Sequence, residues 1–389
     1  MSVRIALGGD VNFSPARGQI ALLVRRRRPP LPKRLLRRLG AMLPFRAAGD
    51  DFHCQEIREI LLEEYGGSWR NPCPEIESDA DPGLPLRGIG SFFRGADIGF
   101  VNLETPLSRG GRHVGSFRSR PEYARTLAAG NIRVVSIANN HSFDAGEGGF
   151  RETLQVLREQ GVLPVGGGMD VLSARAGEVV TIRGLRLGFL AYTAICNSFF
   201  ISLAKRDQPG ILPLFEPMVL EDIAAMRQKC DFLVVAPHFD VENTARVHRN
   251  SIALAHRLID HGADLIVGSH SHVPKPIETY RGKLIIYSLG NLVFTYASRS
   301  WRDGLVAEVT VSAAGECERA RFFPIATGGA ACFSPRLQEG PQASRYLRML
   351  QRRSERKFAL RARLQDGFLE IADFNSPSRF ALQDPPRGQ

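Results

Sequence analysis

The sequence predicts an α/β fold in which two sheets pack face to face and helices cover the outside. Between the N-terminus and residue 267, short apolar, β-branched runs alternate with helix-like segments. After that point, β-rich segments at residues 284–288, 305–311 and 321–325 follow one another without helices between them. Alternation followed by consecutive strands favours two packed sheets with helices outside them.

The individual elements follow from local patterns along the chain. A short apolar run predicts a buried strand, and apolar residues three or four positions apart predict a helix. Further strands are expected at residues 3–7, 97–104, 133–138, 186–194, 232–236 and 265–267. Helices are expected at residues 33–43, 52–65, 121–129, 149–160, 220–229 and 250–261, and a polar, Arg-rich helix at 342–365 precedes an irregular tail. Residues 68–85, rich in Pro, Asp, Ser and Gly, predict an exposed loop.

Length and composition are those of a globular protein with a sizeable core. The chain has 389 residues, of which 43% are hydrophobic, and it contains no apolar stretch long enough to cross a membrane. Its N-terminus enters a strand-like run without the features of a signal peptide, so a cytoplasmic location is expected. The six cysteines are scattered and form no CxxC, which argues against a zinc ribbon or a disulfide framework.

Positive charge is concentrated in one segment. Ten of the basic residues that produce the net charge of +11 lie at positions 17–49, where no acidic residue occurs. Three interpretations stay open: a solvated basic face, attachment to an anionic membrane surface through interleaved leucines, and nucleic-acid binding. Nucleic acid is disfavoured as a partner because Phe45 is the single aromatic residue there that is able to stack on bases.

Polar side chains able to bind a metal follow five of the apolar runs. In open α/β sheets, binding sites lie at the carboxyl ends of strands, so these side chains are expected to converge. Two histidines follow the buried run at 265–267, and a histidine ends the run at 231–238. The residues at the five strand ends are Asp10; Asn102 and Glu104; Asn139, Asn140, His141 and Asp144; His238; and His270 and His272.

Each of these residues also has an ordinary structural interpretation. Asp10 is able to cap a turn, and Asn139 or Asn140 is able to occupy a left-handed turn position, with Asn140 favoured as the ligand. Glu104 is also compatible with a solvated loop, and His238 with a hydrogen-bonded place in the core. A joint coincidence of all of them is less plausible than a shared metal site.

Taken in chain order, the motifs resemble the CapA family, the poly-γ-glutamate capsule synthesis group within the calcineurin-like metallophosphatase fold. The resemblance spans roughly residues 3–12 and 88–325. It rests on Gly9-Asp10, Asn102-Leu-Glu-Thr-Pro-Leu107, Ala138-Asn-Asn-His-Ser-Phe-Asp144, His238, Gly268-Ser-His-Ser-His-Val273, Pro276-Ile-Glu278 and Tyr287-Ser-Leu-Gly-Asn-Leu-Val-Phe294.

The resemblance implies a four-layer α/β/β/α sandwich of the metallophosphatase type. This domain would span residues 1–330, with a basic insertion at about 15–87 after the first strand. Residues 331–389 would form a C-terminal Arg-rich helix and tail. The resemblance also implies two divalent metal ions, and the mixture of oxygen and imidazole ligands suits Mn, Fe or Zn.

Carried over residue by residue, the resemblance gives each site residue a role. Glu104 would bridge the two metals and Asp10 would bind one of them. Asn140 and His238 would complete the second, while His270 and His272 would each supply one ligand. His141 would protonate a leaving group or stabilise developing negative charge, and Asp144 and Glu242 are further catalytic candidates. Asn291 is expected to support the site from behind the ligands.

The sequence departs from the family pattern beside the site. Where the family usually has His-Trp-Gly-x-Glu-Tyr, this chain has His238-Phe-Asp-Val-Glu-Asn243, so Asp240 adds a carboxylate. Ser271 and Lys275 replace the usual Pro and Gln, and Lys275 is expected to favour an anionic substrate. Asn12 stands where the family often has Met, and is a weak candidate oxygen ligand.

The function expected from the resemblance is a metal-dependent, hydrolase-like step in the biosynthesis of a capsule, of poly-γ-glutamate or of a related anionic polymer. Its substrate would be an anionic polymer or a phosphorylated or acyl compound. The alternatives are a generic phosphoesterase and a non-catalytic accessory or assembly factor of a polymer-synthesis complex. Residues 17–49 would permit peripheral contact with the inner membrane face. The oligomeric state does not follow from the sequence.

Overall fold

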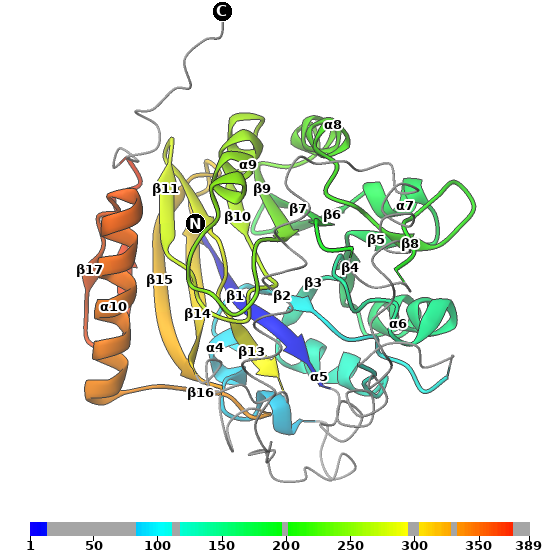
Figure 1. Ribbon diagram of the computed structural model, residues 1–389, viewed down its shortest axis with the longest axis horizontal. Coiled ribbons are helices and arrows are strands. Elements are labelled where there is room, and N and C mark those ends of the chain that lie inside the picture. The colour runs from blue at the N-terminus through cyan, green and yellow to red at the C-terminus, as the bar shows by residue number, and fades with distance from the viewer. Residues whose placement is uncertain (14–82, 111–116, 197–200, 295–302, 328–332, 376–389) are drawn as a thin grey trace, which may run out of the picture.

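The computed structural model describes residues 1–13, 83–110, 117–196, 201–294, 303–327 and 333–375. The basic segment 17–49 and the helices expected at 33–43 and 52–65 lie outside these residues, as does most of the loop expected at 68–85. The described residues form an α/β structure with two large sheets, as the sequence predicts (Figure 1).

The first sheet combines a parallel and an antiparallel part. The parallel strands are β1 (Val3–Asn12), β2 (Ile98–Leu103), β3 (Ile132–Ser136), β4 (Leu163–Val165) and β13 (Asn291–Phe294). The antiparallel strands are β14 (Asp303–Val311), β15 (Cys317–Ala326), β16 (Arg336–Leu337), β17 (Arg363–Leu364) and β18 (Leu369–Ile371). Within the described chain their order is β17-β18-β15-β14-β1-β2-β3-β4, with β13 beside β1 and β16 beside β15.

The second sheet is parallel at its centre and antiparallel at both edges. Its strands are β6 (Glu178–Ile182), β7 (Leu185–Thr193), β9 (Phe232–His238), β10 (Leu265–Val267), β11 (Ile277–Tyr280) and β12 (Lys283–Ile286). They follow the order β11-β12-β10-β9-β7-β6. A separate small sheet pairs β5 (Gly167–Gly168) with β8 (Gly210–Ile211).

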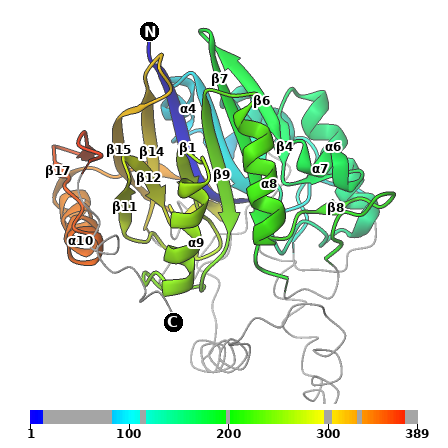
Figure 2. The ribbon, with the colours of Figure 1, turned by 90° about the horizontal axis from the view of Figure 1, so that it is seen from above.

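Three apolar clusters hold the layers together. The cluster between the sheets includes Leu7 and Phe100 from the first sheet and Phe189 and Val234 from the second. A second cluster joins the first sheet to 3₁₀ helix η1 (Leu84–Leu86), α4 (Gly90–Arg94), α5 (Tyr123–Ala129) and α6 (Gly146–Glu159). A third joins the second sheet to α7 (Val171–Arg175), α8 (Glu216–Arg227) and α9 (Arg249–Asp260), the last two shown in front of the sheets in Figure 2. Helices therefore cover the outer face of each sheet, as expected.

The last helix, α10 (Gly340–Phe358), stands at one edge of the paired sheets (Figure 1). Leu347 and Leu350 enter the cluster between the sheets, and the backbone N–H of Ile277 in β11 donates to Ser354 Oγ at 3.0 Å. The helix expected at 342–365 is wrong beyond Phe358, because Ala359 adopts a left-handed backbone (φ 57°). The chain then turns into β17 and β18, which join the first sheet. Within the described residues, no helix combines the length and apolar character that crossing a bilayer needs.

Candidate metal centre

The predicted ligands come together where strands of both sheets end. In the first sheet, Asp10 of β1 is in register with Asn102 of β2 on one side and with Asn291 of β13 on the other. In the second sheet, His238 is the last residue of β9, and His270 follows β10. Parallel strands thus deliver the side chains to one edge, as expected for an α/β site.

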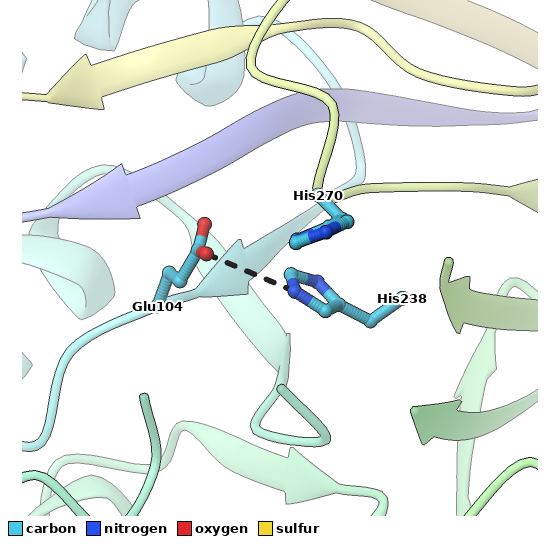
Figure 3. A group of neighbouring side chains, drawn as sticks. All are labelled: Glu104, His238 and His270. Atoms are coloured by element: carbon cyan, nitrogen blue, oxygen red, sulfur yellow. Dashed lines mark ion pairs between the residues drawn. The ribbon is translucent and has the colours of Figure 1, made fainter. Parts of the chain in front are cut away.

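Five of these side chains form two groups that share one carboxylate. We call Glu104, His238 and His270 the His-rich half, and Asp10, Glu104 and His272 the acid-rich half. Within each half the ligand atoms lie within 4.8 Å of one another, and all five residues are buried. Figure 3 shows the His-rich half, in which Glu104 Oε1 lies 3.7 Å from His238 Nε2. Glu104 is thus the residue that belongs to both groups.

Several ligand atoms of the two halves are buried without a hydrogen-bond partner. These atoms are Asp10 Oδ2, both carboxylate oxygens of Glu104 and His270 Nδ1. A buried polar atom without a partner is destabilising, so such a concentration at one point requires a compensating interaction. A divalent cation would supply that interaction, and carboxylate oxygen together with imidazole nitrogen fits Mn, Fe or Zn. The residues present therefore fit the metal centre that the resemblance implies.

Asparagines fix the ligands of the first sheet. Asn102 Nδ2 donates to Asp10 Oδ1 at 2.9 Å, which leaves Asp10 Oδ2 for another partner. Asn139 Nδ2 donates to Asn102 Oδ1 at 3.2 Å and to the Leu103 carbonyl at 2.8 Å. Asn139 is therefore used within the protein, whereas Asn140 Oδ1 lies 2.9 Å from His238 Nε2, beside the His-rich half.

Two hydrogen bonds orient the imidazoles. His238 Nδ1 lies 2.8 Å from Ser269 Oγ, and His272 Nδ1 lies 2.9 Å from Asn291 Oδ1. In both rings the Nε2 atom is then the one aimed at Glu104. Such outer contacts fix the tautomer and the direction of a metal-binding ring. The support expected from Asn291 is in place, whereas the supporting roles of Asn102 and Ser269 did not follow from the sequence.

The backbone of the histidine loop is unusual. His270 and His272 have positive φ values of 95° and 58°, which cost energy for residues other than glycine. Gly268 precedes them at a point where a Cβ would lie 2.3 Å from the Tyr287 carbonyl oxygen. On β1, a Cβ on Gly9 would lie 1.7 Å from the Gly290 carbonyl oxygen. Close backbone approach at both glycines therefore brings Asp10 and the histidines to one place.

Burial disfavours charge throughout this cluster. It raises the pKa of Asp10 to about 7 and, with repulsion from Asp10, raises the pKa of Glu104 well above its usual range. It also lowers the pKa of His238 and His270 well below the usual range and that of His272 to about 4. Neutral imidazoles are ready to coordinate a metal. A cation stabilises the ionised carboxylates because opposite charge offsets desolvation.

The predicted catalytic candidates occupy the rim of the centre. His141 Nδ1 lies 2.8 Å from Asp144 Oδ2, and the same oxygen accepts a hydrogen bond from the Phe117 backbone N–H at 2.8 Å. The His141 side chain is 21% exposed, whereas Asp144 is buried. Glu242 is 43% exposed and its Oε1 lies 3.6 Å from His270 Nε2. His141 and Glu242 thus reach solvent, and Asp144 lies behind His141.

One expectation beside the site is wrong. Lys275 is fully buried, and its Nζ donates to Asp240 Oδ2 at 3.1 Å and to the Arg246 carbonyl at 2.8 Å. It is therefore committed to the protein interior and does not face an anionic substrate. The Asp240 carboxylate, which the sequence adds near the site, is the partner of Lys275 in this ion pair.

Comparisons with known proteins agree with the resemblance seen in the motifs. The family described as bacterial capsule synthesis protein PGA_cap matches residues 45–296. The chain belongs to this family. The match includes Glu104, Asn140, His238, His270 and His272, while Asp10 on β1 precedes it.

The PGA_cap relatives include proteins described in terms of polymer synthesis. A probable polyglutamine synthesis accessory protein of Mycobacterium tuberculosis is 31% identical over 297 residues, covering 71% of this chain and 77% of that protein. The PGA biosynthesis protein CapA of Bacillus subtilis is 30% identical over 226 residues, covering 57% of this chain and 59% of that protein. Among solved structures, the calcineurin-like phosphoesterase YfkN of Bacillus subtilis superposes loosely, with a TM-score of 0.41 and 9% identity over 91% of this chain and 98% of that chain.

Proposed function

We propose that this PGA_cap protein carries out a metal-dependent hydrolytic step in the synthesis of poly-γ-glutamate or a related anionic polymer. Its substrate would be the polymer itself or a phosphorylated or acyl compound. The observation that carries the proposal is the pair of ligand groups sharing Glu104, whose buried oxygens have no hydrogen-bond partner. The descriptions of its relatives support a polymer-synthesis context.

Each half of the centre would hold one divalent ion. Asp10, Glu104 and His272 would hold one, and Glu104, His238 and His270 the other, with Asn140 beside it. When bound, divalent ions supply Lewis-acid polarisation of a substrate oxygen. The protein contributes the burial that excludes water around the ligands and the fixed ring orientations described above.

His141 is suited to proton transfer at the rim. Asp144 Oδ2 accepts the Nδ1 proton of His141, so Nε2 is the nitrogen available to substrate. From that atom a proton passes to a leaving group, or a positive ring stabilises developing negative charge. The Phe117 ring lies against His141 with 4.2 Å between ring centres, which limits rotation of the imidazole. Asp144 is thus a positioning residue.

The test begins with metal content. Elemental analysis of wild type should give about two equivalents of a transition metal, lost in a His270→Ala/His272→Ala variant. A folded wild type that takes up no metal would contradict the proposal. Hydrolysis of poly-γ-glutamate, acyl compounds and an aryl phosphate would then be compared, and turnover of the aryl phosphate alone would indicate a generic phosphoesterase.

His141→Ala separates the enzyme from an accessory factor. The variant should keep its fold and metal content but lose turnover, because the Nε2 atom at the rim is removed. If it retains both the metal and full support of polymer synthesis, the centre is structural. The chain would then be a non-catalytic assembly factor.

A further inference from the structure

The outer face of α10 carries a stripe of arginines. The α-helix advances 3.6 residues per turn, so positions spaced by three and four residues share one face. The residues on the opposite face, Leu347, Leu350 and Ser354, are buried against the sheets. We define the arginine stripe as the five exposed residues Arg345, Arg348, Arg352, Arg353 and Arg356.

The stripe has no acidic counterpart in the part of the chain that the structure describes. Several exposed arginines elsewhere pair with acids, as Arg186 does with Asp231 and Arg257 with Glu216. None of the five stripe arginines makes such an ion pair with a described residue. The helix has a single acid, Glu355. Like charges one turn apart repel, so the stripe weakens the helix unless an anion binds to it.

The five arginines also enclose a common space. Together with Met349 they line a shallow groove of about 330 Å³. The five side chains therefore border one surface depression. From Arg345 to Arg356 the helix rises by about 16 Å, a length that suits an extended chain more than a single small anion.

The chemistry of the stripe favours carboxylates on an extended chain. The guanidinium fork matches a carboxylate with two parallel hydrogen bonds, which an ammonium group does not provide. Binding to a lipid surface would need apolar side chains that insert, and Met349, 36% exposed, is the single large apolar residue in the groove. Nucleic-acid binding would need an aromatic side chain in the groove for stacking on bases, and none lines it.

We infer that the arginine stripe of α10 binds a polycarboxylate chain. The inference rests on the proposed function for the identity of that chain, which is the glutamate polymer. The stripe is firmly joined to the body that carries the metal centre. Ser354 accepts a hydrogen bond from Ile277 of β11, the strand that follows the loop of His270 and His272, and the Phe358 ring stacks on Tyr287.

Binding of fluorescein-labelled poly-γ-glutamate, followed by fluorescence anisotropy at low ionic strength, tests the inference. The stripe variant is Arg345→Gln/Arg352→Gln/Arg356→Gln. The matched control, Arg125→Gln/Arg133→Gln/Arg206→Gln, removes the same charge from exposed positions remote from α10 in the sequence. The stripe variant should bind about tenfold or more weakly than wild type, while the control stays close to wild type. Circular dichroism should show both variants folded, because all six side chains are exposed.

Other outcomes overturn the inference. Equal weakening in both variants would mean that net charge alone attracts the polymer. No binding by wild type would mean that the stripe has another role. Equal dependence on the stripe for a single-stranded DNA of matched charge, or for phosphatidylglycerol vesicles, would mean a general polyanion or lipid surface.

The same measurements distinguish a failure of the inference about the stripe from a failure of the proposed function. The stripe variant should keep the metal content of wild type, because none of its three arginines belongs to either half of the metal centre. If the protein binds poly-γ-glutamate through the stripe but neither takes up metal nor hydrolyses substrate, the result contradicts the proposed function alone. If the protein has full metal content and turnover but its binding of poly-γ-glutamate does not depend on the stripe, the result contradicts this inference alone.

Discussion

The two halves of the metal centre share Glu104 but differ in their other ligands. The His-rich half adds two imidazoles, His238 and His270, both from loops or strand ends of the second sheet. The acid-rich half adds Asp10 from the first sheet and one imidazole, His272. A cation in the acid-rich half would therefore meet two carboxylates, whereas a cation in the His-rich half would meet one. We expect the acid-rich half to prefer the harder metal ion.

The halves also differ in how they are supported. The His-rich half takes both of its imidazoles from the second sheet, and Ser269 holds His238 from within that sheet's own loop, while Glu104 comes from the first sheet. The acid-rich half requires both sheets, because His272 reaches Asn291 of β13 in the first sheet. The comparison teaches that two features join the halves: the Glu104 carboxylate and the loop that carries His272 to the first sheet. Substitutions should therefore separate them.

The largest effect is expected from Glu104→Gln. Removing the shared negative charge should abolish binding of both metals, whereas Asp10→Asn should remove metal from the acid-rich half alone. Elemental analysis and metal titration of the two variants measure this difference. The metal-free Glu104→Gln protein should be at least as stable as wild type, because burial already opposes the Glu104 charge. A variant that keeps one full equivalent would show that the halves do not share this ligand.

A large effect on stability is expected from Lys275→Met. The change leaves the Asp240 carboxylate buried without its partner and should lower the free energy of unfolding by about 3–5 kcal/mol. Lys275 also holds the Val241 and Arg246 carbonyls, so the loop that brings Glu242 to His270 should loosen. Urea denaturation measures the first effect, and metal titration should show a loss confined to the His-rich half.

The double variant Asp240→Asn/Lys275→Met is the control for this pair. It removes both buried charges, and Asn tolerates the left-handed backbone at position 240, where φ is 75°. It should be more stable than Lys275→Met alone, because no uncompensated buried charge remains. Equal losses in the single and double variants would mean that packing of the lysine stem, and not its charge, holds the loop.

Local patterns predict most of the fold, and tertiary packing decides the remainder. The apolar run at 265–267 coincides with β10, because a short β-branched run favours a strand that is buried on both faces. The end of α10 was misplaced because residues 359–365 include no Gly or Pro that would stop a helix. The helix stops at Ala359, and Leu360 enters the core between the sheets. That burial is invisible in the local sequence.

The site shows the same division between local and long-range information. The histidines at 270 and 272 and the acids at 10 and 104 are recognisable because each follows an apolar run in the sequence. The contact between Asn102 and Asp10 depends on the register of β1 and β2, 92 positions apart in the chain. The pairing of Lys275 with Asp240 likewise joins residues 35 positions apart. The sequence shows that both positions depart from the family pattern, but it does not show that the two side chains pair.

Smaller effects are expected from the outer contacts, and these address the halves separately. Asn291→Ala removes the support of His272 and should weaken metal binding to the acid-rich half by about 10–100-fold. Ser269→Ala removes the support of His238 and should weaken the His-rich half by a similar factor. Calorimetric titration of each variant with one metal ion resolves the two binding steps. Equal weakening of both steps in either variant would mean that the halves are one coupled unit.

The last difference between the two halves is in how they respond to pH. Burial raises the pKa of Asp10 to about 7, so below that pH its carboxyl is protonated and must lose a proton to bind metal. Burial lowers the pKa of His272 to about 4, so this ring is already neutral in the same range and adds no proton. The shared Glu104 acts equally on both halves. Between about pH 5 and 7, affinity of the acid-rich half should therefore rise about tenfold more per pH unit than that of the His-rich half. Asp10→Asn removes this extra proton, so metal titrations of the variant across this range should find the pH dependence of the His-rich half unchanged. Parallel pH dependences for the two halves of wild type would contradict the assignment of Asp10 to one half only.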